Sequence, residues 1–518
     1  MDGDAKQQGV SHILRLAEEL LCHILSFLSF RDIVICASSC RTLRAALDGS
    51  TELQYVVELG VNGLSPVVGS HPHLSTSEKL QLLRRAASQW NSAEFIPTTT
   101  ICPLPDGDPE DEMTGGCMHF SEQPYRGEVI DLRAYKPDPA EQPPSSIRRW
   151  SCEDFAQNPS DSVRLIRIDA SQDLMVVAAM LGTRFEEDQY LFRLDLFSMS
   201  TNEWHPLAGR RPLFSHRATR AGGWAAGRTL VRIHGPFVAF YACPFSDDGL
   251  DAWSIQVWNW RERIISDNCV VGDGHFGFTG PHDFDFLDSE RLLVYSFTCE
   301  SAYLSVYSFS DLSKPLEFRT RYAVPIQYPW SSIVNFSSNH VPSQQTCHAH
   351  KRSLWVPTLE DRVVALVAGG SFSLIISIRA LLHPPTYWKE VRTDGISAIP
   401  WETWGPSNAR CICQSDIRCI SGYRVVLDTR HHGNMVLDFN LCRIRRSGSK
   451  IVSNDTISQV SSLSQELTTS LPYAQVKNLP TSELVASMHM DEEMLVVKRF
   501  AGATPSFASS LGDEHVVF

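Results

Sequence analysis

The sequence predicts an α+β multidomain protein, with small N-terminal helices followed by a large all-β domain. Apolar residues recur at helical spacing between residues 11 and 95, and this favours α-helices there. After Val163, short runs of β-branched and aromatic residues are separated by Gly, Pro, Asn and Asp, as is typical of strands. The chain has 518 residues, 43% of them hydrophobic, which indicates a sizeable core rather than disorder.

Three short helices are expected between Leu14 and Leu47. The apolar residues of the first helix recur at spacings of one, three and four positions: Leu20, Leu21, Ile24, Leu25 and Leu28. Asp32 is the expected N-cap of the second helix, and Leu43 lies in the third. Three helices this short cannot bury so much apolar surface among themselves, so they predict a docking partner.

The same stretch resembles a known family, the F-box. The resemblance rests on the order Leu-x-x-Glu-Leu-Leu-x-x-Ile-Leu-Ser-Phe-Leu-Ser-x-Arg-Asp-Ile-x-x-Cys-Ala-x-x-Cys-Arg, from Leu16 to Arg41. The family usually has Pro where this chain has Ala17, and often Trp where it has Leu43. F-box modules dock onto a Skp-type adaptor, which ties them to a cullin ubiquitin ligase. The alternative is an ordinary amphipathic helix pair packed on its own domain.

The resemblance implies a set of adaptor-binding residues along these helices. They are Leu16, Ala17, Leu20, Leu21, Ile24, Leu25, Leu28, Ile33, Cys36, Cys40 and Leu43.

Two further helices follow the box. The first starts after Ser50, and the second starts at Ser75 and Glu78, which have capping-box spacing, and ends beyond Trp90. This pair is similar to the helices that follow the box in a fungal, basidiomycete-type group of F-box proteins. We therefore expect a tail at 1–10, the F-box at 11–49, a helical spacer at 50–95, a Pro-rich and acidic linker at 96–125, and a β domain at 126–518.

The β domain is predicted to be a degenerate β-propeller of six or seven blades. Pairs of strand-like runs recur at intervals of roughly 40 to 60 residues, the range of four-stranded blades. The pair that ends at Val257–Glu262, VWNWRE, resembles a divergent WD-type blade. Two β-sandwich domains are the alternative.

Charge and composition disfavour several classes of protein. The formal net charge is -13 and Lys and Arg form no block, so binding to nucleic acid or to an anionic membrane is not expected. The apolar run Val363–Leu382 is interrupted by Gly369 and Gly370 and contains Arg379, which favours two strands joined by a turn over a membrane span. Fourteen scattered Cys and a polar N-terminus favour the cytosol or the nucleus.

No motif predicts a catalytic residue, a cofactor or a metal site. The G-x-G-x-x-G sequence at Gly272–Gly277 lacks a following helix, so we expect a loop between blades rather than a nucleotide site. The possible metal ligands lack the C-x-x-C pairs of structural zinc sites. They are Cys347, His348, His350, Cys411, Cys413, Cys419, His431 and His432.

The sequence therefore predicts a substrate-recognition subunit of a Skp–cullin–F-box ubiquitin ligase. The box would bind the adaptor, and the β domain would bind a target protein whose identity the sequence does not give. One alternative is an adaptor-bound scaffold without a ligase role. Another is a propeller-type hydrolase, which would need a cluster of acids in the central channel.

Overall fold

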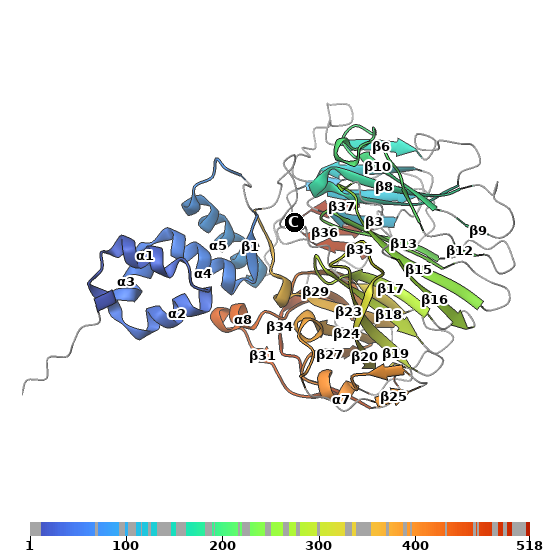
Figure 1. Ribbon diagram of the computed structural model, residues 1–518. Helices are drawn as coiled ribbons and strands as arrows, with labels where there is room; N and C mark the ends of the chain where they lie inside the picture. Colours follow the sequence, from blue (N-terminus) through green and yellow to red (C-terminus); the bar gives the residue numbers. More distant parts are fainter. Residues whose placement is uncertain are drawn as a thin grey trace, which may run out of the picture.

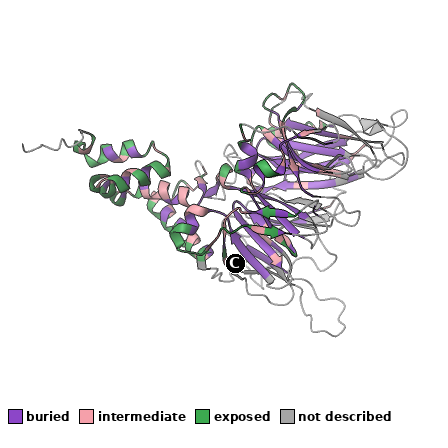
Figure 2. Ribbon diagram, turned by 90° about the horizontal axis from the view of Figure 1, so that it is seen from below, coloured by how far each residue is buried: buried purple, intermediate pink, exposed green. Residues whose placement is uncertain are grey.

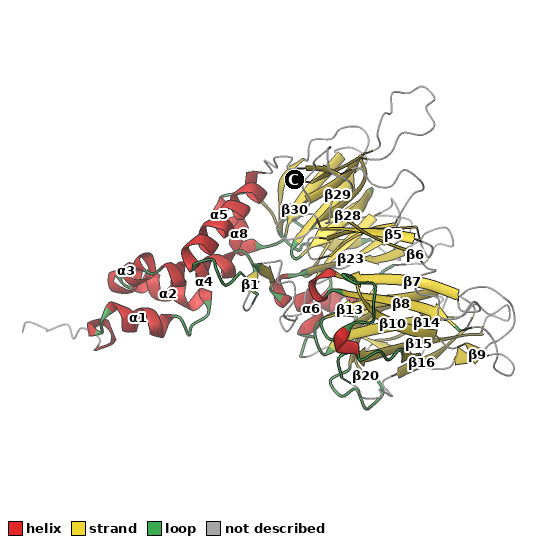
Figure 3. Cartoon of the chain, turned by 90° about the horizontal axis from the view of Figure 1, so that it is seen from above, coloured by secondary structure: helices red, strands yellow, loops and turns green. Residues whose placement is uncertain are grey.

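The chain forms a helical arm joined to one side of a large β body (Figure 1). Seen from above, the helices of the arm project away from the stacked sheets (Figure 3). The structure is a computed structural model that describes residues 12–67, 71–92, 99–101, 110–114, 117–122, 126–131, 147–151, 162–181, 189–190, 192–215, 218–219, 228–243, 250–262, 269–275, 280–297, 301–326, 334–337, 354–368, 372–386, 391–393, 396–429, 433–458, 463, 466–478, 485–490, 495–499 and 514–517.

The arm follows the expected helical order, and capping side chains mark where its helices begin. Its elements are a 3-10 turn (His12–Arg15), α1 (Glu18–Leu25), α2 (Phe30–Ser39), α3 (Arg41–Gly49), α4 (Thr51–Val61) and α5 (Thr76–Ser92). The predicted capping box is confirmed, since Glu78 N donates to Ser75 Oγ at 3.3 Å and Ser75 N donates to Glu78 Oε2 at 2.7 Å. The hydrogen bonds from Ser75 also lower the pKa of the Glu78 carboxyl.

The start of α2 differs from the expectation. Ser29, rather than Asp32, is the N-cap, and its Oγ accepts a hydrogen bond from Asp32 N at 3.3 Å. Ser29 Oγ also donates to the Asp32 carboxylate at 2.7 Å. Asp32 therefore sits inside the first turn, where its negative charge suits the positive end of the helix dipole.

The β body contains seven antiparallel sheets of four or five strands within the described residues. Sheet 1 comprises β3 (Glu110–Thr114), β4 (Cys117–Glu122), β5 (Arg126–Asp131) and β6 (Ile147–Ser151). Sheet 2 comprises β7 (Ser162–Asp169), β8 (Leu174–Met180), β10 (Phe192–Ser198) and β11 (Leu213–Phe214). Sheet 3 comprises β13 (Arg228–His234), β14 (Phe237–Cys243), β15 (Leu250–Asn259) and β16 (Cys269–His275). Sheet 4 comprises β17 (Gly280–Phe286), β18 (Arg291–Phe297), β19 (Ala302–Ser308) and β20 (Glu317–Val324).

Sheets 5 to 7 complete the series. Sheet 5 comprises β21 (Val334–Ser337), β23 (Val363–Ala368), β24 (Phe372–Ser377) and β27 (Ala409–Cys413). Sheet 6 comprises β28 (Ser415–Ser421), β29 (Arg424–Thr429), β30 (Gly433–Asp438), β34 (Tyr473–Asn478) and β31 (Ile451–Val452). Sheet 7 comprises β35 (Val485–Met490), β36 (Leu495–Arg499), β37 (Glu514–Val517) and β2 (Thr99–Ile101). Two-stranded pairs are β1 (Leu64–Pro66) with β22 (Trp355–Pro357), β9 (Gln189–Tyr190) with β12 (Ala218–Thr219), β25 (Val391–Thr393) with β26 (Ile396–Ala398), and β32 (Thr456–Ser458) with β33 (Leu467–Thr469).

Successive sheets pack on one another through shared buried clusters. Each pair of neighbouring sheets shares a buried cluster that contains residues of both. In order from sheets 1 and 2 to sheets 6 and 7, such residues are Val129 and Val177, Leu194 and Val231, Ala239 and Phe284, Leu304 and Phe372, Ile375 and Val425, and Val426 and Met488. The series returns to its start, because β35 of sheet 7 contacts β3 of sheet 1. The predicted fold class is therefore confirmed, and the sheets have the arrangement of propeller blades.

The first part of the β body comes from a segment that was expected to be a linker. Residues 96–125 contribute β2, β3 and β4 to sheets 7 and 1, and β2 pairs with β37 in the register Thr100↔Val516. The linker prediction is wrong here, and the β domain begins before residue 126. A three-residue strand within Pro-rich sequence shows too little alternation to be recognised.

Three other expectations can be compared with the structure. The apolar run at 363–382 forms the antiparallel pair β23 and β24, as predicted, followed by α6 (Ile378–Leu382). The Gly272–Gly277 segment was expected to be a loop, but its first residues belong to β16, where Gly272 pairs with Trp253. Helices α7 (Trp401–Trp404) and α8 (Leu441–Ser447) are short insertions that the sequence did not predict.

No helix among the described residues is both long and apolar enough to cross a membrane.

The arm is attached to the β body at three places. Strand β1 pairs with β22, and Trp355 of β22 shares a buried cluster with Leu59 and Leu83 of the arm. At the end of α5, Trp90 is buried with Val426 and Met488 between sheets 6 and 7. Helix α8, between β30 and β31, contacts α4 and α5 through polar side chains. The spacer helices therefore share a core with the propeller.

Candidate docking site on the N-terminal helices

Helix α1 is apolar on two faces, and only one of them is used inside the arm. Leu21 and Leu25 are 2% and 3% exposed and pack with residues of α2, α3 and α4. On another face, Leu20 is 52%, Ile24 39% and Phe27 76% exposed. We name these three residues the α1 stripe: Leu20 and Ile24, four positions apart, lie above one another on α1, and Phe27 follows two residues after the end of the helix. The stripe offers large apolar side chains to a partner.

The arm carries further exposed apolar side chains outside the α1 stripe. Ile13 and Leu16 precede α1, and Val34 and Ile35 lie on α2, with exposures between 38% and 63%. Residues at the far end of the arm are largely exposed, whereas the sheets are mostly buried (Figure 2). Scattered single apolar residues are normal on a surface, but several large ones on two successive helices are typical of an interaction site.

The structure divides the predicted adaptor-binding residues into three groups. Leu16, Ala17, Leu20 and Ile24 are exposed; Leu28, Cys36, Cys40 and Leu43 are partly buried; Leu21, Leu25 and Ile33 are buried in the core of the arm. A partner cannot reach the last three residues in this conformation, so their role is to support the helices. Contact of the remaining residues with an adaptor stays a prediction.

Several exposed residues were not included in the predicted set. Phe27 is the most exposed large hydrophobic residue of the arm, and Ile13, Val34 and Ile35 join it. The spacing of Leu20, Ile24 and Phe27 could have identified Phe27. Val34 and Ile35 have no such signal, because α2 is apolar at both its buried and its exposed positions.

The electrostatic surroundings of the α1 stripe are mild. Glu18 and Glu19 lie in the first turn of α1, where their negative charge interacts favourably with the positive end of the helix dipole. The ring of His23 meets the ring of Phe27 edge to face, with centroids 4.9 Å apart. Across the described part of the chain, no group of three or more His, Cys, Asp or Glu side chains is arranged to hold a metal ion. The geometry suits apolar docking.

Comparison with protein families supports this interpretation of the arm. Residues 13–53 match the model of the F-box domain. The chain carries an F-box domain. Its matched range extends beyond the predicted end at residue 49, and Leu53 of α4 is indeed buried in the same core as Ile33. F-box domains generally bind a Skp-type adaptor, and the α1 stripe lies within the matched residues.

The other comparisons add little. No curated protein matches the chain. Among solved structures, Hsv2p of Kluyveromyces lactis is 8% identical over 72% of this chain and 99% of its own, with a TM-score of 0.28. The AfRom2 CNH domain is 10% identical over 81% of this chain and 98% of its own, with a TM-score of 0.33. Raptor of Chaetomium thermophilum is 10% identical over 98% of this chain and 40% of its own, with a TM-score of 0.37. These scores are too low to support a conclusion about this chain.

Proposed function

We propose that this protein is the substrate-recognition subunit of a Skp–cullin–F-box ubiquitin ligase. The observation that carries the proposal is the F-box domain at residues 13–53 with an exposed α1 stripe. The F-box domain docks onto the adaptor, and the β body binds a target protein. The proposal places the protein in the cytosol or the nucleus, which its scattered cysteines also favour.

The α1 stripe can supply the energy of adaptor docking. Burying a Leu, Ile or Phe side chain fully is worth about 1.5–3 kcal/mol. Large apolar anchors at the centre of an interface usually contribute most of the affinity, and Phe27 is the largest in the stripe. The stripe is therefore the part of the surface on which docking depends.

A receptor of this kind needs no catalytic residue of its own. It acts by holding a lysine of the target near a ubiquitin-conjugating enzyme, which raises the effective concentration of the two reactants. The propeller contributes a rigid scaffold from which loops can contact the target.

The proposal can be tested by adaptor pull-down with Leu20→Asp/Ile24→Asp. Two carboxylates within an apolar interface would lose their hydration, so we expect adaptor binding to be abolished. The control is Leu207→Asp, which places one carboxylate at an apolar position of the β body that is 50% exposed. Undiminished pull-down of the double variant would refute the docking site. Affinity purification of the two proteins, followed by mass spectrometry, would separate ligase components from candidate targets.

A further inference from the structure

Helix α8 bonds to both spacer helices of the arm. It belongs to the insertion between β30 and β31, and its N-cap, Asn440, donates from Nδ2 to the Val61 carbonyl at 3.0 Å. Arg443 donates from Nη2 to the Ala87 carbonyl at 3.2 Å. Carbonyl groups at the C-terminal ends of helices lack partners within their own helix. Asn440 thus completes hydrogen bonding at the end of α4, and Arg443 adds a bond to a carbonyl within α5.

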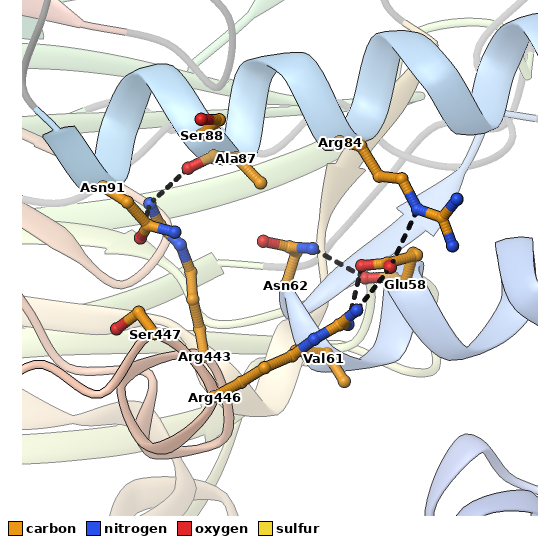
Figure 4. A pocket seen from close by; sticks show the side chains of 10 residues that line it. All are labelled: Glu58, Val61, Asn62, Arg84, Ala87, Ser88, Asn91, Arg443, Arg446 and Ser447. Atoms are coloured by element: carbon orange, nitrogen blue, oxygen red, sulfur yellow. Dashed lines mark hydrogen bonds and ion pairs between the residues drawn. The ribbon is translucent and has the colours of Figure 1, made fainter.

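A buried carboxylate strengthens this contact. The Glu58 side chain is only 6% exposed, and its Oε1 accepts from Arg84 Nε at 3.1 Å and from Arg446 Nη2 at 2.7 Å. Arg446 Nη1 donates to the other oxygen, Oε2, at 2.8 Å, so its guanidinium binds Glu58 with two bonds. Figure 4 shows Arg446 reaching from α8 to the carboxylate, with Arg84 on the opposite side. Two-bonded Arg–carboxylate pairs fix orientation as well as distance.

The contact between α8 and the arm is made by side chains rather than by backbone packing. A hollow of about 270 Å³ lies among them, lined by residues of α4, α5 and α8 that include Asn62, Asn91 and Ser447. Arg443 crosses it, with Nη2 2.7 Å from Asn91 Oδ1 and Nη1 2.6 Å from Asp438 Oδ2. A few directed bonds therefore determine how α8 holds the arm.

We propose that α8 is an orientation clamp, in which Arg443 and Arg446 are positioning residues that fix the angle between the arm and the propeller. The β1–β22 pair and Trp90 attach the spacer helices to the β body, and the α8 side chains add bonds beside both, at Val61 near β1 and at Ala87 and Asn91 near Trp90. The two-bonded Arg446–Glu58 pair resists rocking of the arm that apolar packing at the two attachments would permit. If the protein has the proposed function, on which this step rests, the clamp determines the position of a bound target relative to the adaptor.

The first test is small-angle X-ray scattering of the free full-length protein. Glu58→Gln/Arg446→Gln removes the ion pair without leaving Glu58 as a buried unpaired charge, and Arg443→Ala/Arg446→Ala removes both guanidinium groups. We expect a shift to larger maximum dimension, and faster amide exchange in α8 and at the end of α4. Arg445→Gln is the matched control, since Arg445 is an exposed arginine of the same helix. A folded Glu58→Gln/Arg446→Gln protein with unchanged scattering and exchange would overturn the clamp.

The second test separates the clamp from the proposed function. Adaptor pull-down of the same variants should be unchanged, while self-ubiquitylation in a ligase reconstituted with the adaptor and cullin should lose rate. If self-ubiquitylation stays at the wild-type rate in a variant whose scattering has shifted, the positioning role is refuted. Failure of the wild-type protein to bind the adaptor would refute the proposed function. The comparison of scattering between the free wild-type protein and the variants would still show whether α8 fixes the orientation of the arm.

Discussion

Gly60 of α4 lies directly against the ring of Phe30 of α2. A Cβ added at position 60 would stand 2.1 Å from Phe30 Cγ and 2.6 Å from Phe30 Cβ, far closer than any real contact. The side chain of Phe30 occupies the space that any larger residue at position 60 would need. This approach connects the F-box helices to the spacer.

Replacing Gly60 with alanine should therefore loosen this connection. Overpacking usually costs about 1–3 kcal/mol, so Gly60→Ala should lower the unfolding temperature of the arm, followed by circular dichroism at the helical signal. Adding Phe30→Ala should restore part of the loss by making room. Gly49→Ala is the control, because its new Cβ would meet only the flexible carboxylate of Glu18. Equal unfolding temperatures for Gly60→Ala and Gly49→Ala would contradict the contact.

Phe27→Ala should weaken adaptor binding without unfolding the arm. The side chain is 76% exposed and contacts little besides His23, so its loss leaves the core intact. An interface anchor of this size is worth on the order of 2 kcal/mol, and titration calorimetry with the adaptor would measure the loss. Leu207→Ala on the β body is the control. If Phe27→Ala binds the adaptor with wild-type affinity, Phe27 is not part of the docking site.

Ile33→Ala should act through stability instead. Ile33 is fully buried in the core of the arm, and truncating such a residue typically costs about 2–5 kcal/mol. The neighbouring Val34→Ala serves as control, because Val34 is 43% exposed. Chemical denaturation should show the destabilisation in Ile33→Ala alone, and similar curves for the two variants would show that the buried and exposed faces of α2 are misassigned.

Trp90→Ala should destabilise the propeller, although Trp90 belongs to the arm. Its ring is buried between sheets 6 and 7, with the Arg424 guanidinium 4.4 Å from the ring centroid. Loss of a buried Trp typically costs about 3–5 kcal/mol. Leu82→Ala, at an exposed position of the same helix, is the control. Unchanged thermal unfolding of the sheets would show that α5 is dispensable for the β body.

His205 should make stability depend on pH. Burial lowers the pKa of its imidazole below the usual 6.5, although its bond to the Gln172 carbonyl opposes the shift. The unfolded chain then takes up a proton more readily, so the stabilisation is complete above about pH 6.5 and is lost as the pH falls through the lower pKa of the folded state. Unfolding free energies measured across this range should fall less steeply for His205→Asn. The control is His383→Asn, at an exposed histidine. If the pH profile of stability is the same with and without His205→Asn, His205 is not the source of the pH dependence.

The sequence was sufficient to predict the helical arm and the kind of β domain that follows it. Motif order from Leu16 to Arg41 and the Ser75–Glu78 box are local signals, which agree here with the fold of the whole chain. The F-box match and the observed capping bonds agree with them. The strand runs were recognisable because buried strands leave long β-branched stretches.

The sequence could not show which face of each helix is buried and which is exposed. Leu20 and Leu21 are adjacent and equally apolar, yet the first is half exposed and the second buried. When a helix is apolar on two faces, only the position of its neighbours decides which face is inside. The same limit applies to α8, a helix too short to show periodicity, whose importance comes from residues far away in the chain.

The pairing of β2 with β37 has a consequence for synthesis on the ribosome. Sheet 7 joins a strand at Thr99–Ile101 to one at Glu514–Val517, so translation must pass the later strand before the ring can close. The F-box helices emerge long before this and need no later segment to complete their own core. A message cut short before Glu514 would therefore yield a chain with a complete F-box core and an open, incomplete ring, and under the proposed function such a chain would occupy the adaptor without presenting an intact surface to a target.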